Sequence, residues 1–359
     1  MFPLCAVLQN IGTLSHGTER STPSGMAHIS VVICAHNPRP ERLRRTLDSL
    51  EGQSLSRLRW ELLVVDNASD ASVADGYDLT WHGRARHIRE EKLGLTPARL
   101  RGIAETNGEL VVFVDDDNVL APTFLEEASH IWRRYPYLGV FGSGDIVPEF
   151  EIDPPSEIRP HLNLLALRTI TQAQWSNNVG DFDSTPWGAG LCISRQVADT
   201  YGLLVHRLGP EVIAVLGRRG RALYSGEDDV FSWVAVSLGL GFGVFPSLQL
   251  THLIAADRLN RQYFLRLIYD HAFSQAVRQF VFEGTHPCRI DGFRYAHLLL
   301  HGVRNGRFSM QCQWAWSRGT ESAARFIADR NLKPVDLRDL ADVDRATDRL
   351  GMAARFMSS

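Results

Sequence analysis

Three consecutive carboxylates, Asp115, Asp116 and Asp117, follow directly on the apolar run 110–114. A short apolar run bounded by polar residues predicts a strand that is buried on both faces of a sheet. Open α/β sheets bind their ligands at the carboxyl ends of such strands, which is where these acids lie. Adjacent carboxylates repel one another, and a divalent cation with a phosphorylated ligand relieves that repulsion. An acidic turn after a strand is the alternative interpretation of an isolated triplet.

A second pair of acids, Glu227 and Asp228, precedes the segment 230–238, in which apolar residues recur with a helical period. We therefore predict a helix with both carboxylates in its first turn, where the helix dipole favours negative charge. A carboxylate held at a helix start can take the proton of a hydroxyl group as that group attacks a substrate. One acid at a strand end for a metal and another at a helix start for a base would meet the needs of group transfer.

The residues around the triplet alternate between strand-like and helix-like segments. The runs 29–34 and 61–65 predict buried strands, and a third short strand is predicted at 86–89. Pro40 opens a helix after the first strand, and Thr96 is predicted to cap a later helix. Strands that alternate with helices predict a doubly wound α/β sheet with parallel strands and right-handed connections.

The region 145–254 is less regular. Proline residues interrupt its first part, and glycines accompany the strand-like run 187–193. Glycines there either let the backbone approach a ligand or mark a bulge in the strand. The segments 241–245 and 248–252 predict two short final strands. His252, near the end of the last one, is either a functional residue or an ordinary structural histidine.

The region 255–359 is rich in arginine and in apolar residues with helical spacing, so we predict a helical C-terminal region. Such helices either pack as a cap on the main domain, which we favour, or make a peripheral contact with a membrane surface. The chain has no run of about 18 apolar residues that would predict a membrane span. Residues 1–27 predict a flexible leader that lacks the basic start of a signal peptide.

The composition of the 359-residue chain is that of a soluble globular protein, with 44% hydrophobic and 22% charged residues. A formal net charge of -3 gives no reason to expect nucleic-acid binding. The five cysteines are widely spaced and form no CxxC pair, which favours reduced thiols. We therefore expect a cytoplasmic protein, at the inner face of the membrane if the C-terminal helices bind lipid.

Six short motifs occur in order along the chain. They are Cys34-Ala35-His36-Asn37, Asp66-Asn67-Ala68-Ser69, Thr96-Pro97-Ala98-Arg99, Asp115-Asp116-Asp117, Trp187-Gly188-Ala189-Gly190 and Glu227-Asp228. No single motif is specific, but together they resemble the inverting family 2 glycosyltransferases with a GT-A fold, over about residues 28–254. The resemblance implies a mixed, mostly parallel sheet flanked by helices. It divides the domain into a nucleotide-binding half, 28–144, and an acceptor half, 145–254.

The resemblance also implies roles for residues that bind the nucleotide sugar. Asp66 matches the acid that accepts a hydrogen bond from the nucleotide base, often uracil. Ala35 and Asn37 belong to the loop that lines the nucleoside, although the tyrosine common in that loop is absent here. Arg99 matches an arginine near the base or the diphosphate, whose phosphate oxygens suit a guanidinium geometrically.

The triplet matches the DxD motif of the family, in which Asp115 would contact the ribose side and Asp117 would bind Mg²⁺ or Mn²⁺ at the diphosphate. A metal ion in that position neutralises the negative charge that grows on the leaving nucleoside diphosphate. Asp116 lies between them in the nucleotide-sugar site, and we assign it a structural role. His252 is the candidate for a further metal ligand or a diphosphate contact.

Asp228 falls where the family places its catalytic base, and Glu227 is the competing candidate. The base takes the proton of the acceptor hydroxyl, and attack from the face opposite the leaving group inverts the anomeric centre. Trp187 and Gly188 are candidates for acceptor binding, because a tryptophan beside glycines offers a flat apolar surface to a sugar ring. An ordinary core tryptophan is the alternative.

One motif separates the chain from the processive polysaccharide synthases of the family. Their QxxRW motif is Gln275-Ala-Val-Arg278-Gln279 here, and no membrane span is predicted, which favours the transfer of a single sugar. We expect a metal-dependent inverting glycosyltransferase that uses a nucleotide-diphosphate sugar and a hydroxyl acceptor, and the resemblance favours a UDP-linked sugar as the donor. Polysaccharide, glycolipid and small-molecule acceptors are all open, and so is the oligomeric state.

Two other functions are alternatives to glycosyl transfer. A GT-A-like nucleotidyltransferase usually carries a glycine-rich basic loop after the first strand, where this chain has Ala35-His36-Asn37-Pro38. A non-catalytic nucleotide-sugar-binding module would not need both Asp117 and Asp228. The sequence therefore favours the enzyme over either alternative.

Overall fold

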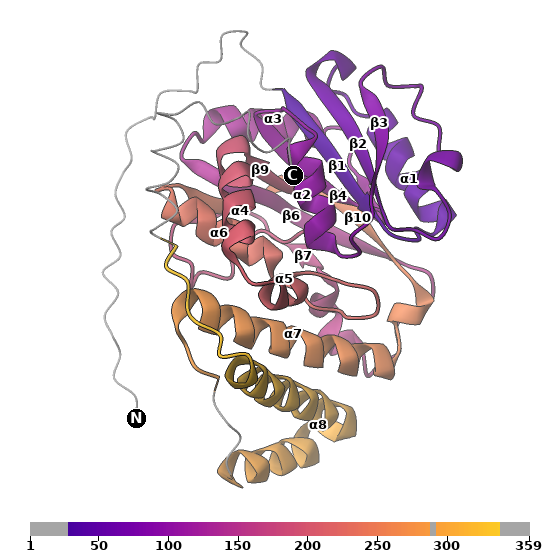
Figure 1. Cartoon of the computed structure of the whole chain (residues 1–359). Helices are drawn as coiled ribbons and strands as arrows, with labels where there is room; N and C mark the ends of the chain where they lie inside the picture. Colours follow the sequence, from indigo (N-terminus) through magenta and orange to yellow (C-terminus); the bar gives the residue numbers. More distant parts are fainter. Residues whose placement is uncertain (1–27, 288–291, 338–359) are drawn as a thin grey trace.

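The computed structural model describes residues 28–287 and 292–337, in which a ten-stranded mixed sheet is the central element (Figure 1). Its strands are β1 (Ile29–Ala35), β2 (Trp60–Asn67), β3 (Ala85–Glu90), β4 (Leu110–Asp115), β5 (Asn118–Leu120), β6 (Leu138–Phe150), β7 (Arg168–Thr169), β8 (Gln174–Ser176), β9 (Leu191–Ser194) and β10 (Gly241–Ile254). Their order is β3-β2-β1-β4-β9-β6-β10-β5, with β7 on β6 and β8 on β10. The first four strands pair in parallel, as do β6 and β10. The predicted α/β sheet is confirmed.

Helices cover both faces of this sheet (Figure 1). They are α1 (Pro40–Glu51), α2 (Leu95–Ala104), α3 (Phe124–Arg134), α4 (Arg195–Arg207), α5 (Pro210–Leu216), α6 (Glu227–Ser237), α7 (Arg261–Glu283) and α8 (Gly292–Asp329). Two of the short 3-10 helices, η3 (Arg159–Leu165) and η4 (Ala256–Arg258), contribute residues to the wall of a cavity. The chain thus alternates strands and helices up to α3 and becomes irregular afterwards.

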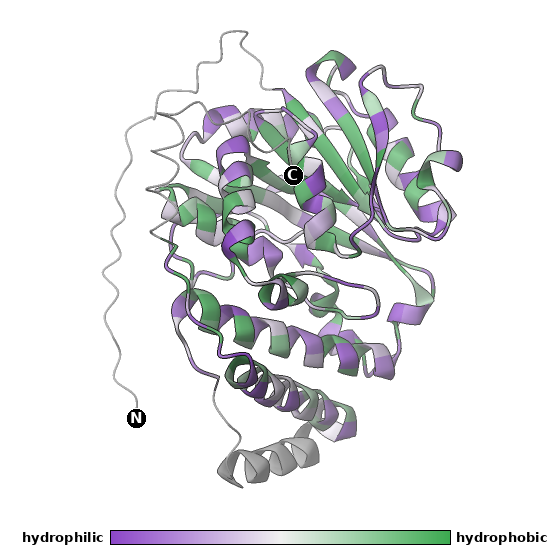
Figure 2. Cartoon of the chain, in the orientation of Figure 1, coloured by the Kyte–Doolittle hydropathy of each residue, from purple (hydrophilic) through white to green (hydrophobic). Residues whose placement is uncertain are grey.

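The sheet is buried on both faces because successive apolar side chains of each central strand point to opposite sides. In β1, Val32 packs with α2, α4 and α6, whereas Val31 and Ile33 pack with α1 and α3. In β4, Phe113 packs on the side of α2, α4 and α6, and Val112 packs on the side of α1 and α3. Figure 2 shows these strands in the hydrophobic colour along most of their length.

Three local predictions were wrong in detail. The segments 241–245 and 248–252 form one strand, β10, which pairs along β6 with an irregularity between Phe245 and Gln249. The strand predicted at 187–193 begins only at Leu191. Helix α2 is preceded by Gly94 instead of being capped by Thr96, which lies inside the helix. Gly94 has a φ of 139°, a conformation that favours glycine, so the helix is preceded by a turn two residues before the predicted cap.

Helix α7 packs against the main domain and gives the C-terminal helical extension that was predicted. Phe273 and Val277 join the core formed by α4 and α6, and Ile327 of α8 packs on the same cluster. The two long helices approach closely at Gly319, where a Cβ atom would lie 2.4 Å from the Tyr269 carbonyl oxygen. Among the described residues, no helix combines the length and the apolar content that a bilayer span requires.

Candidate active site

A cavity of about 980 Å³ lies at the carboxyl ends of β1 and β4 and reaches the first turn of α6. The strand register places Ala35 beside Asp66 and Cys34 beside Asp115, so the predicted residues arrive at one edge of the sheet. Ten of the twelve predicted site residues line this cavity: Ala35, Arg99, Asp115, Asp116, Asp117, Trp187, Gly188, Glu227, Asp228 and His252.

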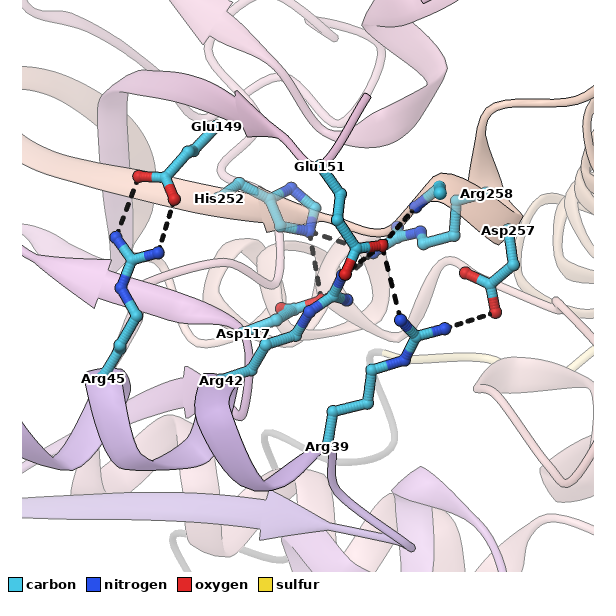
Figure 3. Close-up of polar contacts among 10 residues, drawn as sticks. Arg39, Arg42, Arg45, Asp117, Glu149, Glu151, His252, Asp257 and Arg258 are labelled. Atoms are coloured by element: carbon cyan, nitrogen blue, oxygen red, sulfur yellow. Dashed lines mark hydrogen bonds and ion pairs between the residues drawn. The ribbon is translucent and has the colours of Figure 1, made fainter. Parts of the chain in front are cut away.

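Asp117 and His252, the two predicted metal ligands, are direct neighbours in the cavity wall (Figure 3). Asp117 Oδ2 lies 3.4 Å from His252 Nε2. Arg258 Nη1 lies 3.1 Å from the same carboxylate oxygen and 3.2 Å from the same ring nitrogen. Burial alone would raise the pKa of the Asp117 carboxyl, but His252 and Arg258 outweigh it and hold that pKa well below its usual range. Asp117 is therefore an ionised carboxylate with a cationic group beside it.

Asp115 and Asp116 complete the acidic wall of the cavity. Burial, reinforced by the negative charge of Asp117, raises the pKa of Asp115 and raises that of Asp116 to about 8. The Arg218 guanidinium acts in the opposite direction on all three carboxyl groups. A cation bound at this wall would reduce the repulsion among the three acids.

Charged pairs on the outer surface hold η4, the segment that carries Arg258 (Figure 3). Glu151, just after β6, accepts a hydrogen bond from the Ala256 N–H at 2.7 Å and one from Arg39 at 3.5 Å. Arg39 also donates to Asp257 at 2.7 Å. Each exposed pair contributes little to stability, but together they tie the start of α1, the end of β6 and η4 to one another.

Asp228, the predicted base, lies half-buried in the first turn of α6 and lines the cavity. The N–H of Gly188 donates to Asp228 Oδ2 at 3.1 Å, and the N–H of Asp229 donates to Oδ1 at 3.3 Å. Both donors are backbone groups, which orient the carboxylate while each of its oxygens keeps a lone pair for a substrate.

Glu227, the competing candidate base, is only 2% exposed and uses both carboxylate oxygens within the protein. Its Oε2 accepts a hydrogen bond from Arg99 Nη1 at 2.9 Å, and its Oε1 accepts one from the Tyr201 hydroxyl. This buried ion pair joins α2 to α6. Arg99 was predicted to contact the nucleotide; the structure gives its guanidinium an internal partner, and the nucleotide contact stays a prediction.

Replacing Arg99 with Met should lower the free energy of unfolding by about 3–5 kcal/mol, because the buried Glu227 carboxylate then loses its cationic partner. Arg101→Met is the matched control on the same helix, since Arg101 is 45% exposed and pairs with Glu105 in solvent. Its expected effect is below about 0.5 kcal/mol. Urea denaturation followed by circular dichroism measures both values. Equal losses in the two variants would contradict a structural role for the buried pair.

Asp66, predicted to bind the base, uses its carboxylate to shape the turn after β2. It accepts the N–H groups of Ser69 and Val73 at 3.0 and 3.2 Å and a hydrogen bond from Arg89 at 3.0 Å. Burial acts to raise the pKa of Asp66, but these hydrogen bonds together lower it. Asp66 lies next to the cavity wall without lining it, and its contact with a base stays a prediction.

Asn37 likewise lies outside the cavity wall. Its amide exchanges hydrogen bonds with Asp70, at 2.8 Å to the Asp70 N–H and 3.0 Å to the Asp70 carboxylate. The neighbouring residues His36 and Asn67 line the cavity instead, and Asn67 Oδ1 accepts the Gly94 N–H at 2.8 Å. Successive side chains point in opposite directions at a strand end, so an error of one residue exchanges a cavity residue for a structural one.

Trp187 lines the cavity, but one face of its ring is covered, and its contact with an acceptor stays a prediction. The Arg168 guanidinium lies 3.9 Å from the centre of the Trp187 ring and covers one face. Trp187 itself packs against the core on the α1 and α3 side of the sheet. The exposed aromatic side chain in the cavity wall is Phe182, which is 59% exposed and was not predicted.

Arg278 of α7 also reaches the cavity, although the sequence indicated it only as part of an incomplete QxxRW motif. It forms an ion pair with Asp229 and donates to the Ser225 carbonyl at 3.0 Å. It crosses over Gly226, where φ is 116° and an added Cβ would lie 1.5 Å from Arg278 Nη1. The C-terminal region therefore fixes the turn that leads into the helix carrying Asp228.

Comparisons with known sequences agree with this geometry. Residues 30–189 match the family described as Glycosyl transferase family 2. N-acetylgalactosaminyltransferase 7 of Drosophila melanogaster is 36% identical over 98 residues, which are 26% of this chain and 17% of that protein. The putative glycosyltransferase EpsH of Bacillus subtilis is 29% identical over 102 residues, 28% of each chain. The chain thus spans 17% to 28% of the length of these curated relatives.

A comparison of structures extends the agreement to the fold. The crystal structure of GalNAc-T7 with UDP, GalNAc and Mn²⁺ aligns with a TM-score of 0.50 at 16% identity, covering 92% of this chain and 58% of that one. The sequence match thus assigns residues 30–189 to a glycosyl transferase family 2 domain, and the structural match shows that the chain shares the GT-A fold. This assignment favours glycosyl transfer over the nucleotidyl transfer that was the alternative.

Proposed function

We propose that this chain is a metal-dependent inverting glycosyltransferase that moves one sugar from a nucleoside-diphosphate sugar to an acceptor hydroxyl. The observation that carries the proposal is that two separate sets of carboxylates line one cavity, in environments that suit different roles. Asp117 stands with His252 at the acidic wall, whereas Asp228 is oriented by backbone N–H groups at the start of α6. Glu227, the other candidate base, is buried in an internal ion pair. The Asp117 carboxylate is thus placed to bind a cation, and the Asp228 carboxylate is placed to accept a proton.

In this proposal, the Asp228 carboxylate takes the proton of the acceptor hydroxyl while the hydroxyl oxygen attacks the anomeric carbon. The bond to the nucleoside diphosphate breaks on the opposite face, so the configuration inverts without a covalent intermediate. The Gly188 N–H orients the base at 3.1 Å. Arg278 supports the start of the base helix through Asp229. Such positioning lowers the barrier because the reacting groups are already aligned.

Asp117 and His252 would hold the divalent cation. A carboxylate oxygen and an imidazole nitrogen suit Mn²⁺, and a positively charged group, the Arg258 guanidinium, lies against both. Over the described ranges, no cluster of three or more His, Cys, Asp or Glu side chains could hold a metal ion. Oxygen atoms of the donor diphosphate are the further ligands that we propose. When bound, the cation would stabilise the charge that grows on the leaving diphosphate.

Replacing Arg258 with Met should tighten Mn²⁺ binding, on the order of tenfold, because the guanidinium and the cation compete for one position. Arg258 Nη1 lies 3.1 Å from Asp117 Oδ2 and 3.2 Å from His252 Nε2, the two atoms that we propose as ligands of the cation. Titration of Mn²⁺ followed by electron paramagnetic resonance measures the dissociation constant directly.

The matched control for this prediction is Arg261→Met, because Arg261 follows closely in the chain but forms an exposed pair with Glu157. Its Mn²⁺ affinity should equal that of the unmodified protein. Weaker Mn²⁺ binding in Arg258→Met would contradict the competition and indicate that Arg258 helps to hold the cation.

A uridine diphosphate sugar is the donor that we propose. Support comes from the resemblance of Asp66 to the base-binding acid, and from relatives named as N-acetylgalactosaminyltransferases. The GalNAc-T7 structure of the same fold contains UDP and Mn²⁺. Thermal-shift measurements with UDP, GDP, ADP and dTDP in the presence of Mn²⁺ test the proposal. The largest stabilisation should occur with UDP, and no stabilisation by any of the four would contradict the proposed donor class.

A further inference from the structure

Arg168, in the short strand β7, is a cavity residue that forms no ion pair with a carboxylate of the described residues. Its Nη1 donates to the Thr185 carbonyl at 2.9 Å, and its guanidinium lies over the Trp187 ring. Among the ion pairs formed by the described residues, none includes Arg168. Burial lowers its pKa to about 10, with Asp183 and Asp228 acting in the opposite direction from a longer range. The guanidinium is thus partly desolvated, it lines the cavity, and it has five N–H donors, of which one is used in the bond to Thr185.

Other arginines in the cavity wall have internal partners. Arg99 pairs with Glu227, Arg258 with Asp117, and Arg278 with Asp229. Arg218 is exposed, and its charge acts on the acidic triplet. Arg168 differs from Arg99, Arg258 and Arg278 because it forms no ion pair with a described carboxylate, although the charges of Asp183 and Asp228 act on it. A partly buried guanidinium without a partner is unfavourable, and a carboxylate or phosphate group matches its donors best.

The position of Arg168 relates it to the acceptor side of the cavity. The ring beneath it belongs to Trp187, and the next residue, Gly188, donates its N–H to the base Asp228 at 3.1 Å. An acceptor whose hydroxyl meets Asp228 would therefore bring its neighbouring substituents close to Arg168. The diphosphate, by contrast, is expected at Asp117 and His252.

Phe182 is the second residue that we assign to this subsite, because it lies three residues before Thr185, whose carbonyl accepts the hydrogen bond from Arg168. It lines the cavity with 59% of its surface exposed, although a large apolar side chain gains free energy when it is covered. Aromatic rings of this kind offer a flat apolar surface on which a sugar ring can pack. The ring face of Trp187 cannot do this where Arg168 covers it.

We propose that the acceptor is an acidic saccharide, with its ring on Phe182, its carboxylate or phosphate group on Arg168 and its reacting hydroxyl at Asp228. This inference rests on the proposed function, because it assumes that Asp228 is the base. It narrows the acceptor from any hydroxyl compound to one that carries a negative charge near the attacking oxygen. Carboxylate and phosphate share the chemistry that a guanidinium recognises.

Matched probes that differ only in charge test the proposal. Glucose, glucuronate and glucose 6-phosphate are titrated into the full-length protein by saturation-transfer NMR, with and without UDP and Mn²⁺. The anionic probes should bind at least about tenfold more tightly than glucose, as one charge-assisted contact predicts. The preferred anion identifies whether a carboxylate or a phosphate fits. Equal binding of all three probes would overturn the proposal.

Variants of the subsite assign the preference to Arg168. Arg168→Gln should abolish the preference for the anions and leave glucose binding unchanged, while Arg168→Lys should keep part of it. Arg159→Gln, which removes an exposed arginine paired with Asp153, should behave as the unmodified protein. A preference that survives in Arg168→Gln would overturn the assignment. Thermal melting of each variant verifies its folding.

The same samples separate this inference from the proposed function. Binding of UDP and Mn²⁺ is measured in parallel, and it should be equal in the unmodified protein and in Arg168→Gln. If UDP and Mn²⁺ bind but the anionic probes gain nothing over glucose, the acidic acceptor is wrong and the donor site stands. If UDP and Mn²⁺ do not bind, the proposed function is wrong, and the preference measured without nucleotide still decides whether Arg168 forms an anion site.

Discussion

Replacing Asp228 with Asn is expected to lower the turnover number for glycosyl transfer by a factor of about 10² to 10⁴, the usual contribution of a general base. An amide can accept the Gly188 N–H, which is 3.1 Å from the carboxylate in the structure, but it cannot take a proton from the acceptor. The measurement is the rate of nucleoside diphosphate release in the presence of acceptor. The affinity for UDP and Mn²⁺ should change by less than about twofold, because the cation is assigned to the opposite wall.

Glu227→Gln is the comparison that separates the two candidate bases. Glu227 is buried against Arg99 and Tyr201, so its replacement should lower stability more than it lowers the turnover number. Turnover in Asp228→Asn at the rate of the unmodified protein would remove Asp228 from the mechanism. A loss confined to Glu227→Gln in a fully folded protein would transfer the role of the base to Glu227.

Replacing Asp117 with Asn is expected to abolish Mn²⁺ binding and to lower turnover by a factor on the order of 10³, since a Lewis acid contributes several kcal/mol to such a step. The carboxylate contacts both His252 and Arg258, so its charge organises this wall of the cavity. The measurements are Mn²⁺ titration by electron paramagnetic resonance and the transfer rate at saturating metal.

Removal of the metal from the unmodified protein should have the same effect as the Asp117 variant. Dialysis against EDTA should stop transfer, and added Mn²⁺ or Mg²⁺ should restore it. Asp153→Asn, at a carboxylate that is 83% exposed, is the control and should not alter the metal response. Full activity in a protein shown by elemental analysis to be free of metal would contradict the role of Asp117.

The strand ends and their acids could be predicted from the sequence because they depend on local patterns. An apolar run followed by polar residues places Ala35, Asp115 and their neighbours at one sheet edge without any knowledge of distant contacts. The helix start at Glu227 and Asp228 follows from the spacing of apolar residues after it. These local features account for the position of the cavity and for most of its predicted lining.

Pairing over long sequence distances could not be predicted in the same way. The contacts of Arg99 with Glu227 and of Arg258 with Asp117 join residues 128 and 141 positions apart. No pattern near Arg99 reveals that its charge is neutralised internally. The same holds for Arg168, which covers Trp187 because a short strand, β7, returns along β6.

The direction of side chains at the ends of strands was the second feature that could not be predicted from the sequence. Asp66 and Asn37 were placed in the correct loops, but their polar groups hydrogen-bond within those loops, while His36 and Asn67 line the cavity. Whether an acid after a strand serves a ligand or caps its own turn depends on the path of the next few residues. That path is set by tertiary packing.

The anomeric configuration of the transferred sugar tests the central claim most directly. Direct displacement with Asp228 as base predicts that a donor with an α-linked sugar gives a β-linked product, and this is visible in the proton coupling of the anomeric centre by NMR. Asp228→Asn should give the same product only at its much lower rate. A product that retains the donor configuration would contradict the single displacement and the role of Asp228 as base.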